Sequence, residues 1–240
     1  MLYLIMLITH ANAIDWKDGL LTKPLSKDLC EKQFKTCSCD STKLDTCVPE
    51  YEATIAPISE ELKAKIIGKS WHEGCPLPIK DISTVQLMHW TPEGEIHWGH
   101  INIASVEAEN VAKIFSELYE SHFPITSIKL IHEFNGSDDA SMKVNNTSGF
   151  NCRPIKNTKR WSQHSYGQAL DINPLWNPWV RGTIIDPPEG KEFVDRSNSQ
   201  LGLIRAGDST VLSFEKYGWK WGGYWSNGRK DYQHFSTSGK

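Results

Sequence analysis

Long apolar runs are missing from this 240-residue chain. Its longest apolar stretch, at the N-terminus, is much shorter than the roughly 20 residues that a membrane-spanning helix needs, which argues against a membrane span in the mature chain. Basic residues are scattered and the formal net charge is −3, so neither nucleic-acid binding nor a polybasic membrane patch is predicted. Repeats and low-complexity tracts are absent too. A hydrophobic content of 39% with ten Trp is typical of a globular protein.

Residues 1–13 read MLYLIMLITHANA, a short apolar core followed by small residues at positions 11–13. This pattern is typical of a cleaved signal peptide, although the first residues lack Lys and Arg. A buried N-terminal strand is the alternative interpretation. With a signal peptide, the mature protein would be secreted, extracellular or periplasmic.

The six cysteines agree with export, because an even number in such a chain is typical of disulfides. Four of them lie within eighteen residues, and their C-x6-C-x-C-x7-C spacing lacks the C-x2-C pairs typical of structural zinc. We therefore favour disulfides over a zinc knuckle, with the connectivity of these four left open. The remaining two, Cys75 and Cys152, are expected to pair with each other.

The chain divides into a signal peptide (1–13), a Cys-rich extension (14–70) and a main domain (71–240), which begins near the Pro-rich break at 75–78. Strands are predicted at residues 82–90, 95–103, 125–134 and 167–172, with a final strand and turn carrying Asp231 and His234, and helices at 59–67, 106–123 and 209–217. Strands and helices do not alternate as in βαβ units. The predicted class is therefore α+β, a mostly antiparallel sheet with flanking helices.

Two segments contain the chemically informative residues: SQHSYGQALD at 162–171 and DYQH at 231–234. Together they offer two imidazoles and a carboxylate, from His164, His234 and Asp171, with Asp231 as a spare carboxylate. Three protein ligands, an open position for water and a base to act on that water make up a catalytic zinc site. Taken singly, most His-x6-Asp pairs are a surface histidine and a capping aspartate, and the alternatives for His234 and Asp231 are a core histidine and a solvated turn residue.

The first segment resembles the S-x-H-x-x-G-x-A-x-D signature of the VanY-like zinc D-Ala-D-Ala carboxypeptidases and L-alanyl-D-glutamate endopeptidases, which share a fold with the signalling domain of Hedgehog. The second resembles that family's closing acid-x-x-His. The resemblance extends through 146–153 and 218–223 and covers roughly 75–239. For the first seventy or so residues we identify no family resemblance.

The resemblance implies one Zn²⁺ per chain and a general-base role for Asp231. It also implies that Arg153 stabilises the oxyanion, and the alternative for this residue is a surface salt bridge. Ser162 and Tyr166 are candidates for binding substrate or orienting a metal ligand. Four tryptophans could line a substrate groove, but packing in the core is the better default: Trp176, Trp219, Trp221 and Trp225.

The predicted function is that of a secreted, monomeric zinc metallopeptidase acting on peptidoglycan stem peptides. Cleavage of D-Ala-D-Ala and cleavage of L-Ala-D-Glu are both compatible with the residues. Two alternatives remain: a Hedgehog-like binding module whose metal is structural, and a peptidase that acts on substrates outside the cell wall. The role of the Cys-rich extension, as a wall-binding segment, a propeptide or a brace, is open.

Overall fold

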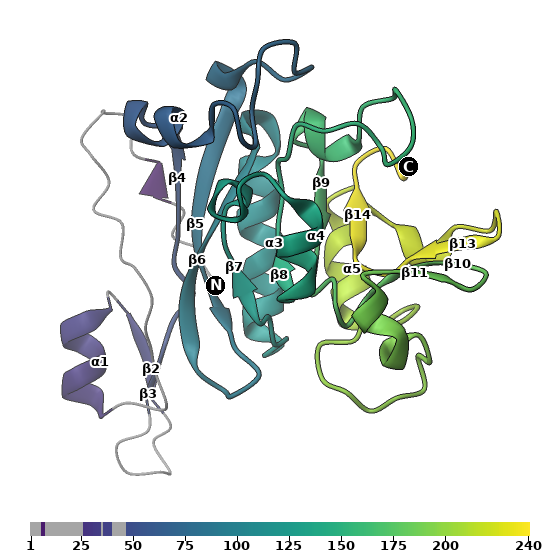
Figure 1. The fold of residues 1–240 in the computed structure, drawn as a ribbon. Helices are drawn as coiled ribbons and strands as arrows, with labels where there is room; N and C mark the ends of the chain where they lie inside the picture. Colours follow the sequence, from purple (N-terminus) through teal and green to yellow (C-terminus); the bar gives the residue numbers. More distant parts are fainter. Residues whose placement is uncertain (1–5, 8–25, 35, 40–46) are drawn as a thin grey trace.

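The computed structural model describes residues 6–7, 26–34, 36–39 and 47–240 (Figure 1). The fold is α+β, with several small sheets and few helices, as predicted. The α-helices are α1 Lys27–Gln33, α2 Glu60–Ile66, α3 Ala108–Glu120, α4 Asp138–Lys143 and α5 Ser209–Lys216. The strands are β1 Met6–Leu7, β2 Cys37–Cys39, β3 Cys47–Pro49, β4 Ala53–Pro57, β5 Ile82–Trp90, β6 Ile96–Ala104, β7 Ser127–Ile128, β8 Asn146–Thr147, β9 Ala169–Asp171, β10 Trp179–Arg181, β11 Ile184–Asp186, β12 Lys220–Trp221, β13 Arg229–Asp231 and β14 His234–Ser236. Short 3₁₀ helices are η1 Ile79–Asp81, η2 Ser105–Glu107, η3 Ile131–Phe134, η4 Gln163–Tyr166, η5 Pro188–Phe193 and η6 Gly222–Tyr224.

The largest sheet has the order β1-β4-β5-β6. Its centre is the predicted hairpin, in which β5 and β6 pair antiparallel from Ile82↔Ala104 to Trp90↔Ile96. At the turn, Thr91 N donates to the carbonyl of Glu95 over 2.7 Å. Strand β4 joins the other side of β5, and β1 pairs in parallel with β4.

Helix α3 packs on this sheet and forms one continuous core with it. The helix was expected over 106–123; it starts later, after η2, and ends at Glu120. Val85 and Leu87 of β5 are fully buried in the same cluster as Val111 and Phe115 of α3. The core therefore extends from the large sheet across α3 towards the C-terminal half of the chain.

On the far side of this core lies the small sheet β12-β14-β9 (Figure 1). Its apolar side chains are part of the same core, which therefore fixes the position of the sheet. Leu170 of β9 lies opposite Phe235 of β14, and the Phe235 ring stacks on Phe214 of α5 with 3.7 Å between centroids. Side chains alternate between the two faces of a strand. Because Leu170 and Phe235 point into the core, their neighbours Asp171 and His234 share the opposite face.

The strand predicted over 125–134 is wrong for most of its length. Only Ser127–Ile128 form a strand, and Ile131–Phe134 turn into η3. The Glu133 side chain accepts a hydrogen bond from the backbone N of Leu130 over 3.0 Å, and Asn135 follows with φ 55. A side chain that caps its own backbone, followed by a left-handed residue, stops an otherwise strand-like run of apolar residues.

All six cysteines form disulfides, and the expected Cys75–Cys152 pair is confirmed. The pairs left open by sequence are Cys30–Cys37 and Cys39–Cys47. They staple α1, β2 and β3, which occupy the purple end of the ribbon in Figure 1. Cys30, Phe34 and Cys47 are buried against Met88 of β5, so the stapled segment covers apolar surface of the main sheet.

Strand β4 precedes residue 70 and pairs with β5 over five residues, so strands on both sides of the predicted domain boundary share one sheet. Helix α2 begins at the predicted Ser59 cap, whose Oγ accepts from Leu62 N over 3.1 Å. Of the predicted signal peptide, Met6–Leu7 lie in β1 and the rest falls outside the described residues. Within the described ranges, no helix combines the length and apolar character that crossing a bilayer requires.

Candidate metal centre

His164 is held by the short helix η4. At its start, the Ser162 Oγ accepts a hydrogen bond from the backbone N of His164 over 3.4 Å, so Ser162 acts as the cap of this turn. At its end, Gly167 adopts φ 62, and its carbonyl accepts from Ala104 N at the end of β6. A Cβ at Gly167 would lie 2.4 Å from Ala104 N, so only glycine permits this close approach.

The His164 imidazole is oriented by the carbonyl of Gly149, 2.6 Å from Nδ1. Because Nδ1–H donates to this carbonyl, Nε2 is the ring nitrogen that faces Asp171. It lies 3.1 Å from Oδ2 of Asp171. In the described part of the chain, this buried Nε2 has no hydrogen-bond partner.

Asp171 and His234 meet across the β9–β14 ladder, where they lie directly opposite each other. Oδ1 of Asp171 is 3.0 Å from Nδ1 of His234, and Nε2 of His234 donates to the carbonyl of Lys240 over 3.2 Å. The neighbouring pair on the same face is small, Ala169 opposite Ser236, which leaves space beside the two side chains.

One ligand atom from each of His164, Asp171 and His234 lies within 4.8 Å of the others. A tetrahedral zinc ion with bonds of 2.0–2.1 Å places its ligand atoms about 3.3 Å apart. His234 Nδ1 lies 3.0 Å from Oδ1 of Asp171 and His164 Nε2 lies 3.1 Å from Oδ2, so each imidazole is at such a distance from one oxygen of the shared carboxylate. The three side chains are at most 9% exposed. A His₂Asp donor set with an orphaned imidazole nitrogen fits zinc.

The electrostatics of the site also favour a cation. Burial raises the pKa of Asp171, but His164 and His234 outweigh that effect and hold the pKa well below its usual range. Burial lowers the pKa of His234, but the hydrogen bond to Asp171 has the larger effect, so the pKa of His234 is raised. A buried carboxylate that stabilises a proton on a neighbouring imidazole provides the negative charge that a metal cation needs.

Asp231 lies at the end of β13, outside the group of three close ligands. Burial is the main cause that raises the pKa of Asp231, and repulsion from Asp171 adds to it. Attraction to His234 acts in the opposite direction, and the resulting pKa is about 7. Among the described residues, its Oδ1 has no hydrogen-bond partner. A carboxylate with a pKa near neutrality is suited to take up and return a proton. A Cβ at Gly222 would lie 2.7 Å from the Asp231 carbonyl, so glycine is needed where η6 packs against this residue.

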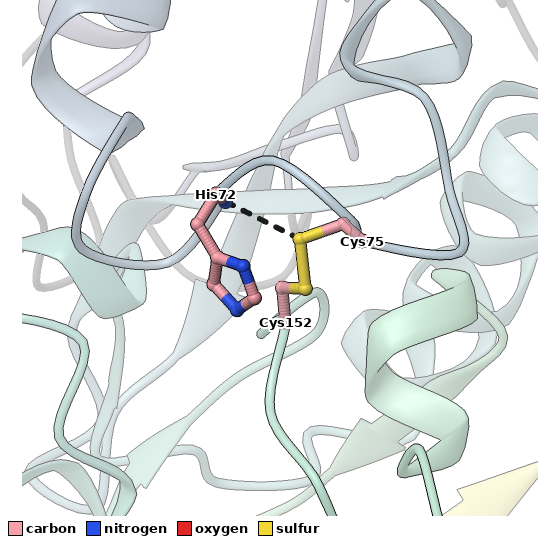
Figure 2. Close-up of side chains that lie close together, drawn as sticks. All are labelled: His72, Cys75 and Cys152. Atoms are coloured by element: carbon pink, nitrogen blue, oxygen red, sulfur yellow. Dashed lines mark hydrogen bonds between the residues drawn. A yellow bond between two sulfur atoms is a disulfide. The ribbon is translucent and has the colours of Figure 1, made fainter.

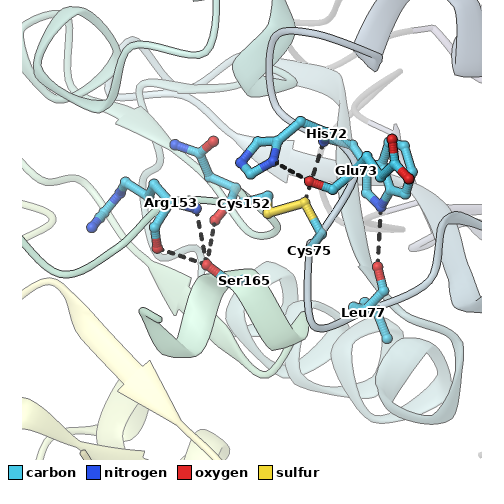
Figure 3. The surroundings of a disulfide bond; sticks show 9 residues. His72, Glu73, Cys75, Leu77, Cys152, Arg153 and Ser165 are labelled. Carbon is cyan, nitrogen blue, oxygen red and sulfur yellow. Dashed lines mark hydrogen bonds between the residues drawn. A yellow bond between two sulfur atoms is a disulfide. The ribbon is translucent and has the colours of Figure 1, made fainter. Parts of the chain in front are cut away.

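Arg153 follows Cys152, and Figure 3 shows how its backbone is tied to η4. Ser165 Oγ accepts from Arg153 N over 2.9 Å and donates to the Arg153 carbonyl over 2.7 Å. The guanidinium forms an ion pair with Asp138 of α4. Burial lowers the pKa of Arg153, but Asp138, Asp171 and Asp231 outweigh it and raise the pKa. Arg153 is therefore a fixed cation within the field of both site carboxylates.

The other residues predicted for the site differ in burial and in their distance from the candidate ligands. Ser162 is buried and caps η4, whereas Tyr166 is 38% exposed. Trp219 and Trp221 belong to the core, as the default predicted. The Trp225 ring, in contrast, lies 5.8 Å from the ring of His234.

Three supporting residues were not identified from sequence as parts of the site: Gly149, Asp138 and Ser165. Asp138 carried a weak signal, because the pair Asp138-Asp139 is conspicuous in the sequence, but it reads as a cap and does lie in the first turn of α4. Gly149 and Ser165 act through a backbone carbonyl and a buried hydroxyl; both lie in the family-like stretches, but Ser165 occupies a variable position of the signature and a backbone carbonyl carries no side-chain signal.

A second cluster of potential ligands, His72, Cys75 and Cys152, lies near the start of the main domain (Figure 2). Its two sulfurs are bonded to each other, and Cys75 Sγ accepts from the backbone N of His72 over 3.2 Å. Metal binding by cysteine requires a thiolate. As a disulfide, this cluster is a staple, not a metal site.

Residues 156–237 match the model of a protein family described as D-alanyl-D-alanine carboxypeptidase. The match covers about a third of the chain and includes His164, Asp171, Asp231 and His234; Arg153 precedes it. No curated protein and no solved structure gives a significant match.

Proposed function

We propose that this chain is a secreted zinc peptidase that hydrolyses peptide bonds in peptidoglycan stem peptides. The observation that carries the proposal is the buried convergence of His164, Asp171 and His234, with Asp231 close by but outside the ligand set. The match of this segment to the D-alanyl-D-alanine carboxypeptidase family supports the substrate class. The resemblance of residues 162–171 and 231–234 to the motifs of the VanY-like peptidases supports it further.

In this proposal His164 binds zinc through Nε2 and His234 through Nδ1, because their other nitrogens donate to backbone carbonyls. Asp171 supplies the negative ligand. When bound, zinc acts as a Lewis acid and lowers the pKa of water to about 7. Asp231 takes the proton from the attacking water and returns it to the leaving amine, a role suited to a carboxylate whose Oδ1 has no hydrogen-bond partner among the described residues.

Arg153 stabilises the negative charge that develops on the oxygen of the scissile carbonyl. The role suits a cation that the Cys75–Cys152 disulfide, Ser165 and Asp138 hold in place, because a preorganised charge needs no reorganisation during the reaction. Ser162 orients the His164 turn, and Tyr166, on the surface beside it, contacts substrate. Both the D-Ala-D-Ala bond and the L-Ala-D-Glu bond are compatible with these residues.

The remaining parts of the proposal concern the whole chain. Complete pairing of the six cysteines supports an oxidising compartment and hence a cleaved signal peptide at 1–13. Cleavage removes only the two-residue edge strand β1 and leaves β4, β5 and β6 paired with one another. The Cys-rich extension, 14–70, serves as a brace for the peptidase domain, 71–240, because its buried residues pack on Met88 and Trp90 of the main sheet. The protein acts as a monomer.

The test is a peptidoglycan digest whose products are identified by mass, with zinc measured in each protein. Asp231→Asn removes the base, and Asp139→Asn is a matched control, because Asp139 is exposed and pairs only with Lys156 among the described residues. We expect one zinc per chain in all three proteins and stem-peptide products from all but Asp231→Asn. Zinc without cleavage by any of them would contradict the proposal and favour a binding module.

A further inference from the structure

Two arginines share the face of the sheet on which Asp231 lies. In β13, Arg229 and Asp231 are two residues apart and so point to the same face, whereas Lys230 points to the other. In the antiparallel partner β10, Arg181 lies opposite Arg229, and Trp179 lies opposite Asp231. Directly opposite residues also share a face. Arg229 and Arg181 therefore stand about 7 Å along the sheet from the proposed base.

This pair of like charges is unfavourable unless something neutralises it. Like charges directly opposite each other destabilise a strand pair. In the described part of the chain, neither guanidinium has an ion pair with an acidic side chain, and Nε of Arg229 is buried without a hydrogen bond. The register thus sets two arginines opposite each other, with no acidic partner for either among the described residues.

Trp225 connects Arg229 to the metal centre. The guanidinium carbon of Arg229 lies 4.5 Å from the centroid of the Trp225 ring, and that ring lies 5.8 Å from the ring of His234. Trp225 Nε1 donates to the carbonyl of Gly239 over 3.0 Å, which fixes the ring. Stacking on an aromatic face orients a guanidinium while its N–H groups remain available to a ligand.

A cavity of about 340 Å³ lies at this place, and Tyr224, Trp225, Asn227 and Arg229 are among its lining residues. Its volume is at the lower end of the range for small-molecule sites and is sufficient for one or two amino-acid residues. The lining combines an aromatic wall with the cations Arg229 and Lys240 and the amide of Asn227. This composition suits a polar, anionic group better than an apolar one.

We propose that Arg229 and Arg181 bind a free carboxylate of the peptide substrate and thereby determine specificity. The inference rests on the proposed peptidase function and names the group that the enzyme recognises beside the scissile bond. A carboxylate matches the fork of donors on a guanidinium, which binds it through two parallel hydrogen bonds. Stem peptides supply such groups at their C-terminus and on the α-carbon of D-Glu.

The test compares cleavage of matched synthetic peptides by the intact enzyme. One pair ends in D-Ala-D-Ala with its C-terminal carboxylate either free or amidated; the other contains L-Ala-D-Glu with the D-Glu α-carboxylate either free or amidated. Arg229→Gln and Arg181→Gln remove the proposed contacts, and Arg229→Lys keeps the charge without the fork. Lys230→Gln is the matched control, since it removes one positive charge from the opposite face of the same strand.

Whichever of the two peptide pairs the enzyme cleaves, we expect the wild-type enzyme to prefer the peptide with the free carboxylate over its amide. Arg229→Gln should raise KM for that peptide by about 10- to 100-fold, the loss expected for a hydrogen bond to a charged group, with little change for the amide. Arg181→Gln should have a smaller effect in the same direction, Arg229→Lys should restore part of the preference, and Lys230→Gln should change neither peptide. Equal use of acid and amide by the wild type, or equal effects of Arg229→Gln and Lys230→Gln, would overturn the inference.

A binding measurement separates this inference from the proposed function. The affinity of the same peptides for Asp231→Asn, with and without Arg229→Gln, is measured by calorimetry. If the loss of Arg229 weakens binding of the acid but not of the amide, the carboxylate site is supported. This holds even if no peptide is cleaved, and then only the peptidase proposal fails. Binding that is insensitive to Arg229 for both acid and amide overturns the carboxylate site, whatever the outcome of the cleavage assay.

Discussion

Asp171 and His234 lie directly opposite each other on β9 and β14, with Oδ1 of Asp171 3.0 Å from Nδ1 of His234. The same ladder places Leu170 opposite Phe235, both fully buried. One register therefore sets the core on one face and the candidate metal ligands on the other. A slip of one residue would exchange the two sets.

Replacing the shared carboxylate should remove metal binding while the shape of the site is kept. Asp171→Asn loses the negative charge between His164 and His234. We expect zinc affinity to fall by more than about 100-fold, beyond the loss typical of groups that only support a ligand. Competition with a chromogenic chelator measures this, with Asp186→Asn as a control outside the site. Unchanged zinc affinity would show that Asp171 is not a ligand.

Gly149→Ala should disturb the site through the backbone. An added Cβ would lie 2.6 Å from the carbonyl of Asn102 and 2.8 Å from the Ile101 side chain, so the segment after β8 that carries the His164 acceptor must shift. Overpacking of this kind costs about 1–3 kcal/mol. Thermal unfolding should show a midpoint lowered by roughly 2–10 °C, together with weaker zinc binding. A stable variant with unchanged zinc affinity would rule out a positioning role for Gly149.

Removing the Arg153 guanidinium should affect the chemical step more than substrate binding. We expect Arg153→Ala to lower kcat by about 100-fold, the usual effect of losing one oxyanion donor, with zinc content unchanged. Asp138→Asn should give a smaller loss, because the guanidinium remains but loses its ion-pair partner. The measurement is the separate determination of kcat and KM on a cleaved stem peptide. A change confined to KM would instead assign Arg153 to substrate binding.

The three disulfides should contribute unequally to stability. Cys75 and Cys152 are 77 residues apart, whereas Cys39 and Cys47 are 8 apart. In the loop-closure picture, the longer loop stabilises by about 4.5 kcal/mol and the shorter by about 2.5 kcal/mol. Denaturant unfolding of the Cys75→Ser/Cys152→Ser and Cys39→Ser/Cys47→Ser double variants tests this order. A larger loss from the shorter loop would point to specific packing in the Cys-rich segment.

A buried histidine remote from the metal centre should make stability depend on pH. Burial lowers the pKa of His89 from 6.5 to about 4, so in acid the unfolded chain binds a proton that the folded chain excludes. Stability is therefore complete above pH 6.5 and is lost as pH falls from 6.5 to 4, by about 2 kcal/mol at pH 5. Urea unfolding of wild type and His89→Leu at pH 7.5 and pH 5 isolates the effect. Equal pH dependence in both proteins would exclude His89 as its source.

The sequence predicted the parts of this molecule that depend on local pattern. The 82–90 and 95–103 hairpin is visible as two apolar runs around Thr91-Pro-Glu-Gly94, and the Ser59 cap marks α2. The short elements α1, β2 and β3 were not predicted, because two disulfides rather than periodicity define them. The strand predicted over 125–134 failed because a cap by the Glu133 side chain is invisible to hydrophobic periodicity.

The candidate ligands could be found because their side chains carry the chemistry and their spacing is short within each segment. The residues that orient them depend instead on contacts between distant parts of the chain. Gly149 reaches His164 through its carbonyl, and Asp138 meets Arg153 only once α4 has formed. The alignment of Arg229 with Asp231 likewise depends on the strand β13, of which only Asp231 was singled out.

The central claim is that His164, Asp171 and His234 form one catalytic zinc site. Its most direct test is to strip the purified protein of metal and add zinc stepwise while cleavage of a stem peptide is followed. The account predicts activity that rises linearly and ends at one zinc per chain, with none recovered by Asp171→Asn. Full activity in the metal-free protein, or equal recovery by Asp171→Asn, would contradict it.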